Sequence, residues 1–366
     1  MFEWIGIRAA KDAWKIARLE NDEFVNEMDG LRGDGYEAVS LAGNFIPERY
    51  DNPKIAMRGL RMIVEKWGIT DLRIGIRWSI VDSGNGKLDL SYYKPFLEYC
   101  FTHSVDIVLS IGPIKTPAYP EEFVPDYIWK EIGTARKYTV IRSQSDLANK
   151  AVQYQRQLLE YLKIYLSPGK LARIKYFQIE NECFTRFGHF MLKSSVEYIR
   201  QIIVQTQEFF PGKPILLNSS GRLGLRQILK TLDPLRGRFC VGQDYYYQDQ
   251  WRTQAFWKVI EPMGWLLFPW NISNEQLQQK AEERGYFLEI TETQVEPWHP
   301  VYDPGNSVVS LRFVLYICLK SAFAHYKREP VLRLWGLEYL TKQYLEKSNT
   351  SEHNQIVSLI RSLTRP

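Results

Sequence analysis

The sequence predicts a closed (β/α)8 barrel, or TIM barrel, and two observations support this fold class. Beyond about residue 36, short β-rich runs alternate with amphipathic helical stretches, and eight such runs occur along the 366 residues. Strands that alternate with helices favour parallel pairing, and right-handed crossovers then limit the topology. Eight units of this kind fit a closed barrel better than an open sheet.

The eight expected strands span residues 37–43, 71–78, 106–111, 175–180, 214–218, 239–245, 286–291 and 331–335. Between them, the stretch 53–68 has Pro53 near its first turn and ends on Gly68, which is the usual punctuation of a helix. The stretch 145–166 begins at Ser145, a good N-cap, and carries apolar residues at helical spacing. Stretches 194–210 and 307–326 behave similarly, and 351–366 is expected to be a final helix.

The pattern predicts a single catalytic barrel with an added segment at its start. Residues 1–36 are expected to form a helical extension packed on the barrel, and residues 37–366 to form the barrel with its C-terminal helix. Repeats, low-complexity tracts and interdomain linkers are absent from the sequence. The oligomeric state cannot be inferred from these features.

Composition excludes several classes of protein. The net charge of +5 is modest and its basic residues are dispersed, so we expect no nucleic-acid partner. The cysteines at 100, 183, 240 and 318 lack the spacing of a metal or disulfide framework, and we expect them to be reduced core residues. The 11 Trp and 22 Tyr exceed the usual needs of a core, and such a surplus often marks surfaces that stack on ligands.

The N-terminus gives an expectation about localisation. Glu3, Arg8 and Lys11 interrupt the apolar run that a signal peptide needs, and no window approaches 18 uncharged apolar residues. We therefore expect a cytoplasmic protein with no membrane partner, while a trimmed leader stays open.

The alternation of side chains along the strands predicts a charged barrel interior. Arg73 and Arg77 share one face of their strand, Glu180 and Glu182 share one face of theirs, and Arg333 lies on the polar face of the last strand. With the apolar faces turned toward the helices, these five charges point inward together. Unpaired buried ions cost several kcal/mol, so we expect Glu180 to be the structural partner of an interior arginine.

Active sites of such barrels lie at the carboxyl ends of the strands, and two acids stand out there. Glu182 follows the fourth expected strand and Glu292 follows the seventh, so the two carboxylates are expected to face each other across the barrel mouth. Glycosidic cleavage uses such a pair, and a separation of about 5–5.5 Å implies a covalent intermediate with retention. At that range the charge of one carboxylate raises the pKa of the other.

Other side chains at the same ends are candidates for binding a sugar. Asn181 is expected to hold the 2-hydroxyl, Tyr245 or Tyr246 to orient Glu292, and Trp335 to offer a flat apolar face. The remaining substrate-binding candidates are Asn44 and Arg77, which end the first two strands, and the aromatic Trp298.

Four motifs resemble those of the clan A glycoside hydrolases. They are "NE" at Asn181-Glu182, "ITE" ending at Glu292, "RIGIRWS" on the second strand and "LWG" on the eighth. The general pattern is that of the cellulase-like family 5 and its relatives, over roughly residues 37–345. The resemblance implies that Glu182 is the acid/base, Glu292 the nucleophile and Asn181 its 2-hydroxyl helper. It also implies that Arg77 supports the nucleophile and that Trp335 floors the subsite of the cleaved sugar.

Two departures favour a relative outside family 5 itself. That family usually places a histidine after strand three, where this chain reads "IGPIKTP" with Lys115. It also has His-x-Tyr on strand six, where this chain has Asp244, Tyr245 and Tyr246.

Strand parity leaves one point open near Glu292. This residue aligns with Leu288 and Ile290, whereas Glu289 and Thr291 share the other face. A bulge at the strand end would reconcile the two, or Glu289 would be another member of the interior ion pairs. Both alternatives are kept here.

The leading hypothesis is therefore a retaining glycoside hydrolase that cleaves β-glycosidic bonds in oligo- or polysaccharides, with no cofactor and no metal. A transglycosylase would use the same groups, and a non-catalytic carbohydrate-binding protein would keep the aromatics but mispair the two glutamates. A metal-dependent enzyme needs inward acids on neighbouring strands, where this chain offers Lys115 and Asn218. The sugar, its linkage and endo or exo action stay open.

Overall fold

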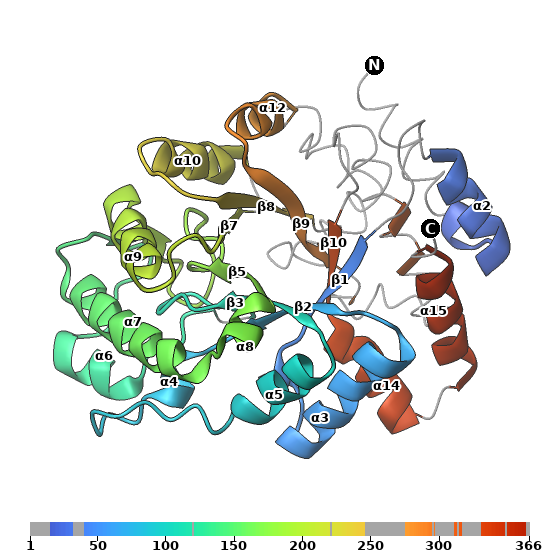
Figure 1. The fold of residues 1–366 in the computed structure, drawn as a ribbon, viewed down its shortest axis with the longest axis horizontal. Helices are drawn as coiled ribbons and strands as arrows, with labels where there is room; N and C mark the ends of the chain where they lie inside the picture. Colours follow the sequence, from blue (N-terminus) through green and yellow to red (C-terminus); the bar gives the residue numbers. More distant parts are fainter. Residues whose placement is uncertain are drawn as a thin grey trace.

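The eight predicted strands form one closed, parallel barrel, which confirms the predicted fold class (Figure 1). The computed structural model describes residues 15–31, 40–118, 121–219, 222–245, 275–294, 296, 311–312, 315–316, 331–347 and 350–363. Around the barrel the order is β1-β10-β9-β8-β7-β5-β3-β2. The strands are β1 (Ser40–Asn44), β2 (Asp71–Gly75), β3 (Asp106–Ser110), β5 (Ile174–Gln178), β7 (Ile215–Ser219), β8 (Phe239–Tyr245), β9 (Phe287–Gln294) and β10 (Val331–Trp335).

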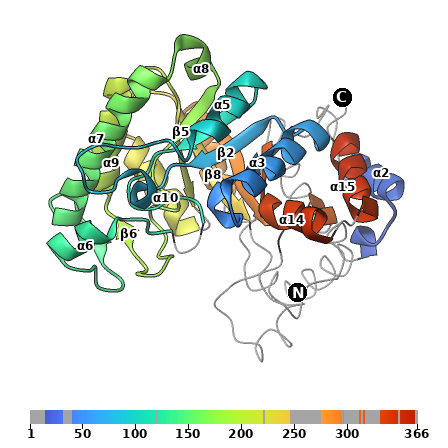
Figure 2. The same cartoon turned by 90° about the horizontal axis from the view of Figure 1, so that it is seen from below.

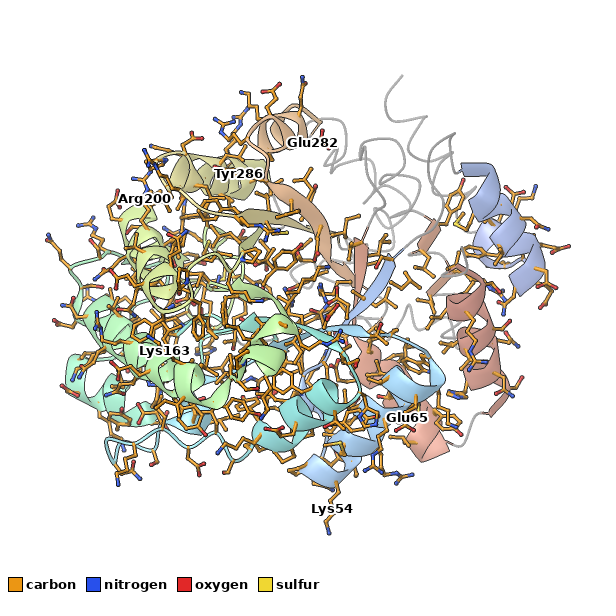
Figure 3. All side chains as sticks on the ribbon, viewed as in Figure 1. Lys54, Glu65, Lys163, Arg200, Glu282 and Tyr286 are labelled. Atoms are coloured by element: carbon orange, nitrogen blue, oxygen red, sulfur yellow. The ribbon has the colours of Figure 1, made fainter. Side chains whose placement is uncertain are left out.

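Helices cover the outside of the barrel, and Figures 1 and 2 show them around the strands. Among the described residues, the longer helices around the barrel are α3 (Pro53–Arg61), α5 (Lys94–Thr102), α7 (Asp146–Tyr165), α9 (Val196–Phe209), α10 (Arg222–Leu232), α12 (Glu275–Glu283) and α14 (Leu337–Lys347). Shorter helical segments are η1 (Pro47–Arg49), α4 (Trp78–Val81), α6 (Asp126–Ile132) and α8 (Pro168–Ala172). Charged tips on this outer layer, such as that of Lys54, extend outward in Figure 3.

The helix starts follow from their capping residues. Asn52 accepts hydrogen bonds from the backbone N–H groups of Lys54 and Ile55, with Pro53 in the first turn of α3. This helix continues as η2 (Met62–Lys66), a π-helix, before Gly68 turns the chain with a φ of 74°. Ser145 caps α7 as predicted by accepting from Ala148 N, and Ser195 caps α9. The stretch 307–326 lies largely outside the described residues.

The two ends of the described chain pack against each other beside the barrel. Helix α2 (Asn21–Leu31) lies next to α15 (Thr350–Leu363) in both Figure 1 and Figure 2. The side chain of Asn21 donates to the backbone oxygen of Gln355 at 2.9 Å and accepts from Arg312. The predicted boundary at residue 36 lies outside the described residues, so the division into segments 1–36 and 37–366 stays a prediction.

Paired charges close the lower part of the barrel interior, as strand parity predicts for Arg333. This guanidinium is fully buried and bonds to Asp71 at 2.7 Å and to Glu289 at 3.1 Å. Lys175 adds ion pairs of 2.8 Å to Asp71 and 2.6 Å to Glu289. Glu289 is therefore a member of the interior ion pairs, because two cations compensate its burial.

A bulge in β9 brings Glu292 into the interior as well, so both alternatives left open by parity are present. Ile290 pairs with Gln243 and Glu292 with the next residue, Asp244, which leaves Thr291 as the extra residue. The pairing of β9 with β10 shifts at the same place. An extra residue reverses the alternation of side chains, and Glu292 is therefore directed inward despite its parity with Ile290.

Two further expectations concern the cysteines and membrane-spanning helices. Cys100, Cys183 and Cys240 are free thiols buried in the core, and Cys318 lies outside the described residues. In the part of the chain that the structure describes, no helix is long and apolar enough to cross a membrane.

Gly112, just after β3, lets the end of β5 approach closely. A Cβ atom at this position would lie 2.5 Å from the Cα of Glu180 and closer still to its backbone nitrogen. Backbone atoms cannot rotate away as a flexible side chain can, so the two segments would have to separate.

We predict that Gly112→Ala lowers the free energy of unfolding by about 1–3 kcal/mol, the usual range for overpacking. Urea denaturation measures this loss. Gly169→Ala in α8 is the matched control, since nothing lies within 4 Å of its added Cβ, and its stability should match or exceed the wild type. Equal denaturation midpoints for Gly112→Ala and wild type would contradict the close packing.

Candidate active site

The segment after β5 has an unusual backbone. Glu180 and Glu182 adopt φ values of 44° and 41°, on either side of Asn181. Residues other than glycine rarely occupy this left-handed region, and they do so mainly where surrounding contacts impose it at functional sites. The contacts of Glu180, Lys115 and Asn218 account for this conformation.

Glu180 anchors the segment through backbone groups. Its carboxylate accepts hydrogen bonds from the N–H groups of Ile114 and Lys115 and from the Tyr198 hydroxyl at 2.8 Å. The expected pairing of Glu180 with an interior arginine is therefore wrong. Strand β5 ends at Gln178, and the left-handed turn at Glu180 breaks the alternation from which that pairing was extrapolated.

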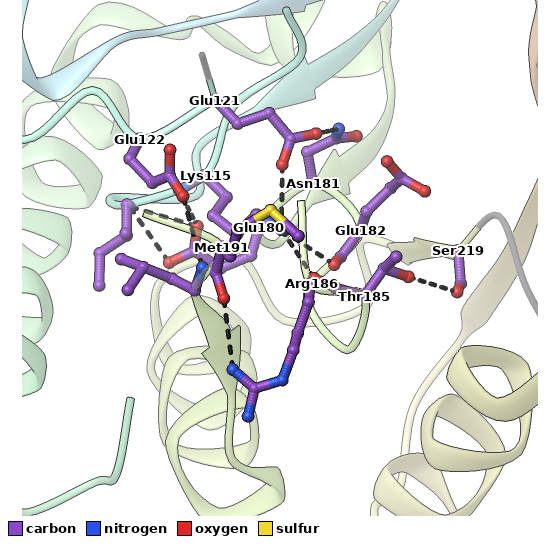
Figure 4. A network of polar contacts seen from close by, with 12 residues as sticks. Lys115, Glu121, Glu122, Glu180, Asn181, Glu182, Thr185, Arg186, Met191 and Ser219 are labelled. Atoms are coloured by element: carbon purple, nitrogen blue, oxygen red, sulfur yellow. Dashed lines mark hydrogen bonds and ion pairs between the residues drawn. The ribbon is translucent and has the colours of Figure 1, made fainter. Parts of the chain in front are cut away.

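Lys115 holds the same segment, and Figure 4 shows it among its partners. Its fully buried ammonium forms an ion pair with Glu121 at 3.0 Å and donates to the backbone oxygens of Glu182 and Thr185 at 3.2 and 3.1 Å. The three N–H groups of the ammonium thus meet three acceptors. Burial opposes the charge, but Glu121 and Glu182 outweigh it and raise the pKa of Lys115. The carboxylate of Glu182 points away from the centre of this network in Figure 4.

The segment also connects to the chain on both sides of α6. Glu122 accepts from the backbone N–H of His189 at 2.6 Å. The short strands β4 (Val140–Ile141) and β6 (Lys193–Ser194) pair in parallel next to these residues. Residues on both sides of Glu182 are therefore held by residues 120–144, the insertion after β3.

Two asparagines link Glu182 to the neighbouring strands. Asn181 donates to Glu121 at 2.6 Å and accepts from Asn218 at 2.9 Å. Asn218, at the end of β7, accepts from the backbone N–H of Glu182 at 3.1 Å and donates to Asp244 at 2.9 Å. All of these side chains are buried, so the bonds are protected from water.

Glu292 comes from the bulged end of β9 and forms a buried ion pair with Arg73 of β2. The resemblance implies Arg77 as the support of this carboxylate, and the structure corrects this to Arg73. Strand β2 ends at Gly75, and Arg77 lies beyond it, where it contacts Glu48 at 3.6 Å and the ring of Phe123 at 3.9 Å. Arg73 lies within the strand, and its inward side chain therefore reaches across the barrel mouth.

Trp335 lies beside this ion pair but is mostly covered. Its side chain is 6% exposed, and the Arg73 and Arg49 guanidiniums lie 5.8 and 6.0 Å from its ring centre. Its Nε1 donates to Glu296 at 3.0 Å, and Glu296 forms a 2.9 Å ion pair with Arg49. The ring is thus fixed by polar contacts before any ligand binds.

The other sequence candidates divide between described and undescribed residues. Asn44 is fully buried and donates to the backbone oxygens of Leu334 and Thr291 at 3.0 and 3.4 Å, so its amide joins β1 to β10 and β9. Tyr246 and Trp298 lie outside the described residues, and Tyr245 is described only in its backbone. Their expected roles stay predictions.

Electrostatics connects the acids of the mouth. Burial first, and then the charge of Glu182, raise the pKa of Glu292 to about 7 against the opposing effect of Arg73. Burial and the charges of Glu292 and Glu182 also hold the pKa of Asp244 well above its usual value. The carboxylates from the ends of β5, β8 and β9 therefore lie within electrostatic reach of one another.

Sequence reasoning missed two contributors to this site. Asp244 was noted only as a departure from a family pattern, and Glu121 was not singled out. A signal for Asp244 existed, because it shares a strand face with Gly242, and a glycine in a strand often marks a close approach. Among the described residues, no group of three or more His, Cys, Asp or Glu side chains could hold a metal ion.

Comparison by sequence finds no matching family model and no matching curated protein. Comparison by structure finds similar barrels. The β-galactosidase from Bacillus circulans sp. alkalophilus superposes with a TM-score of 0.55 at 12% identity, over 91% of this chain and 57% of that one. Xylanase10C from Cellvibrio japonicus gives a TM-score of 0.54 at 10% identity, over 92% of this chain and 72% of that one. The catalytic domain of the β-amylase from Paenibacillus polymyxa gives a TM-score of 0.56 at 10% identity, over 90% of this chain and 100% of that one.

The fold therefore resembles that of clan A glycoside hydrolases at low sequence identity. The chain spans little more than half the length of the β-galactosidase. At these identities the similarity concerns the fold alone, and the function of the site depends on its own side chains.

The Glu180 carboxyl gives a pH-dependent test of the segment that carries Glu182. Burial raises its pKa from 4.5 to about 7. Between these values the folded state holds a proton that the unfolded state has lost, so stability falls as pH rises from about 4.5 to 7.

We predict that Glu180→Gln removes this part of the pH dependence, on the order of 1 kcal/mol per pH unit. Denaturation at pH 5, 6, 7 and 8 measures the stability difference between wild type and variant, which should change in favour of the variant up to about pH 7 and then level off. The matched control is Glu160→Gln on the exposed face of α7, whose difference from wild type should stay constant. A constant difference for Glu180→Gln would show that Glu180 does not titrate in this range.

Proposed function

We propose that this protein is a retaining glycoside hydrolase that cleaves β-glycosidic bonds, with Glu182 as acid/base and Glu292 as nucleophile. One observation carries the proposal. Two buried carboxyls, from the ends of β5 and β9, lie near enough for the charge of Glu182 to raise the pKa of Glu292. Their position at the carboxyl ends of the strands is where barrel enzymes bind substrates.

The first step needs an ionised Glu292 and a protonated Glu182. Glu292 attacks the anomeric carbon while Glu182 gives its proton to the leaving glycosidic oxygen, which forms a glycosyl ester on Glu292. In the second step Glu182 takes a proton from water, the water oxygen attacks the anomeric carbon, and the Glu292 carboxylate is released. The two inversions together retain the configuration.

The contacts of each carboxyl hold it in position for these roles. Arg73 orients Glu292 and favours its ionised form, since its ion pair with Glu292 is buried. The backbone of Glu182 is held on three sides, by Lys115, Asn218 and the turn at Glu180, so its side chain is presented in a fixed position. Asn181 uses one amide N–H on Glu121, and the described residues give no acceptor for the second, which we assign to a sugar hydroxyl.

Replacement of either glutamate tests the assignment. We predict that Glu182→Gln and Glu292→Gln each lower turnover at least about 10³-fold on a panel of aryl β-glycosides and β-glucans, because residues that act as a unit fail together. Glu160→Gln, on the outer face of α7, is the matched control and should keep wild-type rates. A variant of Glu182 or Glu292 with wild-type turnover would remove that residue from the mechanism.

Product analysis separates the proposed function from its alternatives. A transglycosylase would convert the same substrates into longer products while losing activity in the same two variants. A carbohydrate-binding protein would bind a sugar of the panel with no turnover by the wild type. Either outcome would replace hydrolysis as the activity of this site.

The pH profile tests which glutamate is the nucleophile. The value of kcat/KM reports groups of the free enzyme, and the pKa of Glu292 is about 7. If Glu292 must be ionised to attack, kcat/KM rises with pH through about 7. If Glu292 were instead the proton donor, kcat/KM would fall through the same range, and the two roles would have to be exchanged. We predict the rising limb, measured with an aryl β-glycoside from pH 5 to 9.

A further inference from the structure

Asp244 is a third buried carboxyl beside the two glutamates, and neither the sequence pattern nor the proposed mechanism gives it a role. It pairs in register with Glu292 on the neighbouring strand, and the two residues are 4% and 1% exposed. Parallel strands lie about 5 Å apart, so two acids at paired positions repel each other strongly when buried. An acid in such a position is costly to keep, and its contacts indicate what it does.

Both oxygens of Asp244 bind side chains from the adjacent strands. Oδ2 accepts from Asn218 of β7 at 2.9 Å, and Oδ1 accepts from the Thr291 hydroxyl of β9 at 2.6 Å. Gly242, two residues earlier in β8, makes room for this arrangement. A Cβ there would lie 2.6 Å from the Thr291 hydroxyl oxygen and 2.9 Å from the Cβ of Asn218. Asn218 and Thr291 therefore converge above Gly242 on the carboxylate of Asp244.

These contacts connect the two glutamates to one group. Asn218, held by Asp244, accepts from the backbone N–H of Glu182 at 3.1 Å. Thr291, held by Asp244 from the other side, is the bulge residue that immediately precedes Glu292. A shift of Asp244 would therefore move both glutamates, and their separation would change.

We propose that Asp244 is the positioning residue of this site, which fixes the spacing of Glu182 and Glu292 through Asn218 and Thr291. This inference rests on the proposed function of the two glutamates. The chemistry of Asp244 itself consists of accepting two hydrogen bonds, and it takes no part in bond making or breaking.

The protonation of Asp244 indicates which substitution preserves its contacts. The charged groups that act on it are Glu292 and Glu182, which raise its pKa after burial, and Arg73, which lowers it. Because its pKa is raised, Asp244 keeps its proton at pH values where a free aspartate is ionised, and a neutral Asn at this position resembles that protonated form. Replacement of Asp244 by Asn should therefore leave the ionisation of Glu292 near its wild-type range.

Two substitutions test whether the hydrogen bonds of Asp244 position the two glutamates. Asp244→Ala removes both hydrogen bonds, and we expect kcat to fall about 100-fold with KM changed less than about threefold, since misplacement by about 1 Å has such a cost. Asp244→Asn keeps the shape and both contacts, because its oxygen can accept from Asn218 and its amide can donate to Thr291. It should restore most of kcat and keep the acid limb of kcat/KM where the wild type has it. Asp233→Ala and Asp233→Asn, at an exposed ion pair with Arg284, are the matched controls and should behave as wild type.

Wild-type kcat in Asp244→Ala would overturn the proposal, as would Asp244→Asn with as large a loss of kcat as Asp244→Ala. If Asp244→Ala does not fold, Asp244→Asn decides the matter, because a large loss of kcat in a variant that keeps both hydrogen bonds contradicts the positioning role.

Failure of the proposed function itself would look different, since the wild type would then be inactive on the whole panel. In that case stability gives the readout. A folded-state pKa above the unfolded value makes stability fall as pH rises above about 4, so Asp244→Asn should reduce this loss of melting temperature. A melting temperature with unchanged pH dependence would overturn the placement of Asp244 as a buried carboxyl held between Asn218 and Thr291.

Discussion

The compensation of buried charge is the constraint on which this structure depends. Arg73 with Glu292, Arg333 with Glu289 and Lys115 with Glu121 are all ion pairs whose members are at most 2% exposed. Unpaired burial of any one of them would cost several kcal/mol, so each partner fixes the position of the other. The first two pairs join strands that are distant in sequence, and Lys115 also binds the backbone of Glu182, so the same contacts that make the interior tolerable also set the geometry of the barrel mouth.

The fold followed from the sequence because its signals are local. Alternation of strands and helices, Pro53 at the start of one helix and Ser145 at the start of another each act over a few residues, and the structure confirms them. The interior position of Arg73 and Arg333 was predictable for the same reason, since strand parity holds within a strand. Eight regular units then leave little freedom in topology.

The site was less predictable because the regular alternation of side chains stops at the strand ends, where the site begins. The positive φ of Glu180 turns its carboxylate away from the arginines, and the extra residue in β9 turns Glu292 inward. Neither departure has a strong sequence signature, because non-glycine residues in left-handed conformations depend on contacts made by other segments. The choice of Arg77 as the partner of Glu292 came from the family resemblance, whereas β2 ends at Gly75 and leaves Arg77 beyond the strand.

The insertion after β3 has a consequence for attempts to alter this protein. Glu121 and Glu122 at its start bind Lys115, Asn181 and His189, and β4 near its end pairs with β6. The insertion is therefore no detachable module. An engineer who exchanged it for a shorter loop to widen the entrance would also withdraw the supports of the strained turn that presents Glu182. Reshaping would succeed only if the graft retained both acids at the first two positions after Pro120.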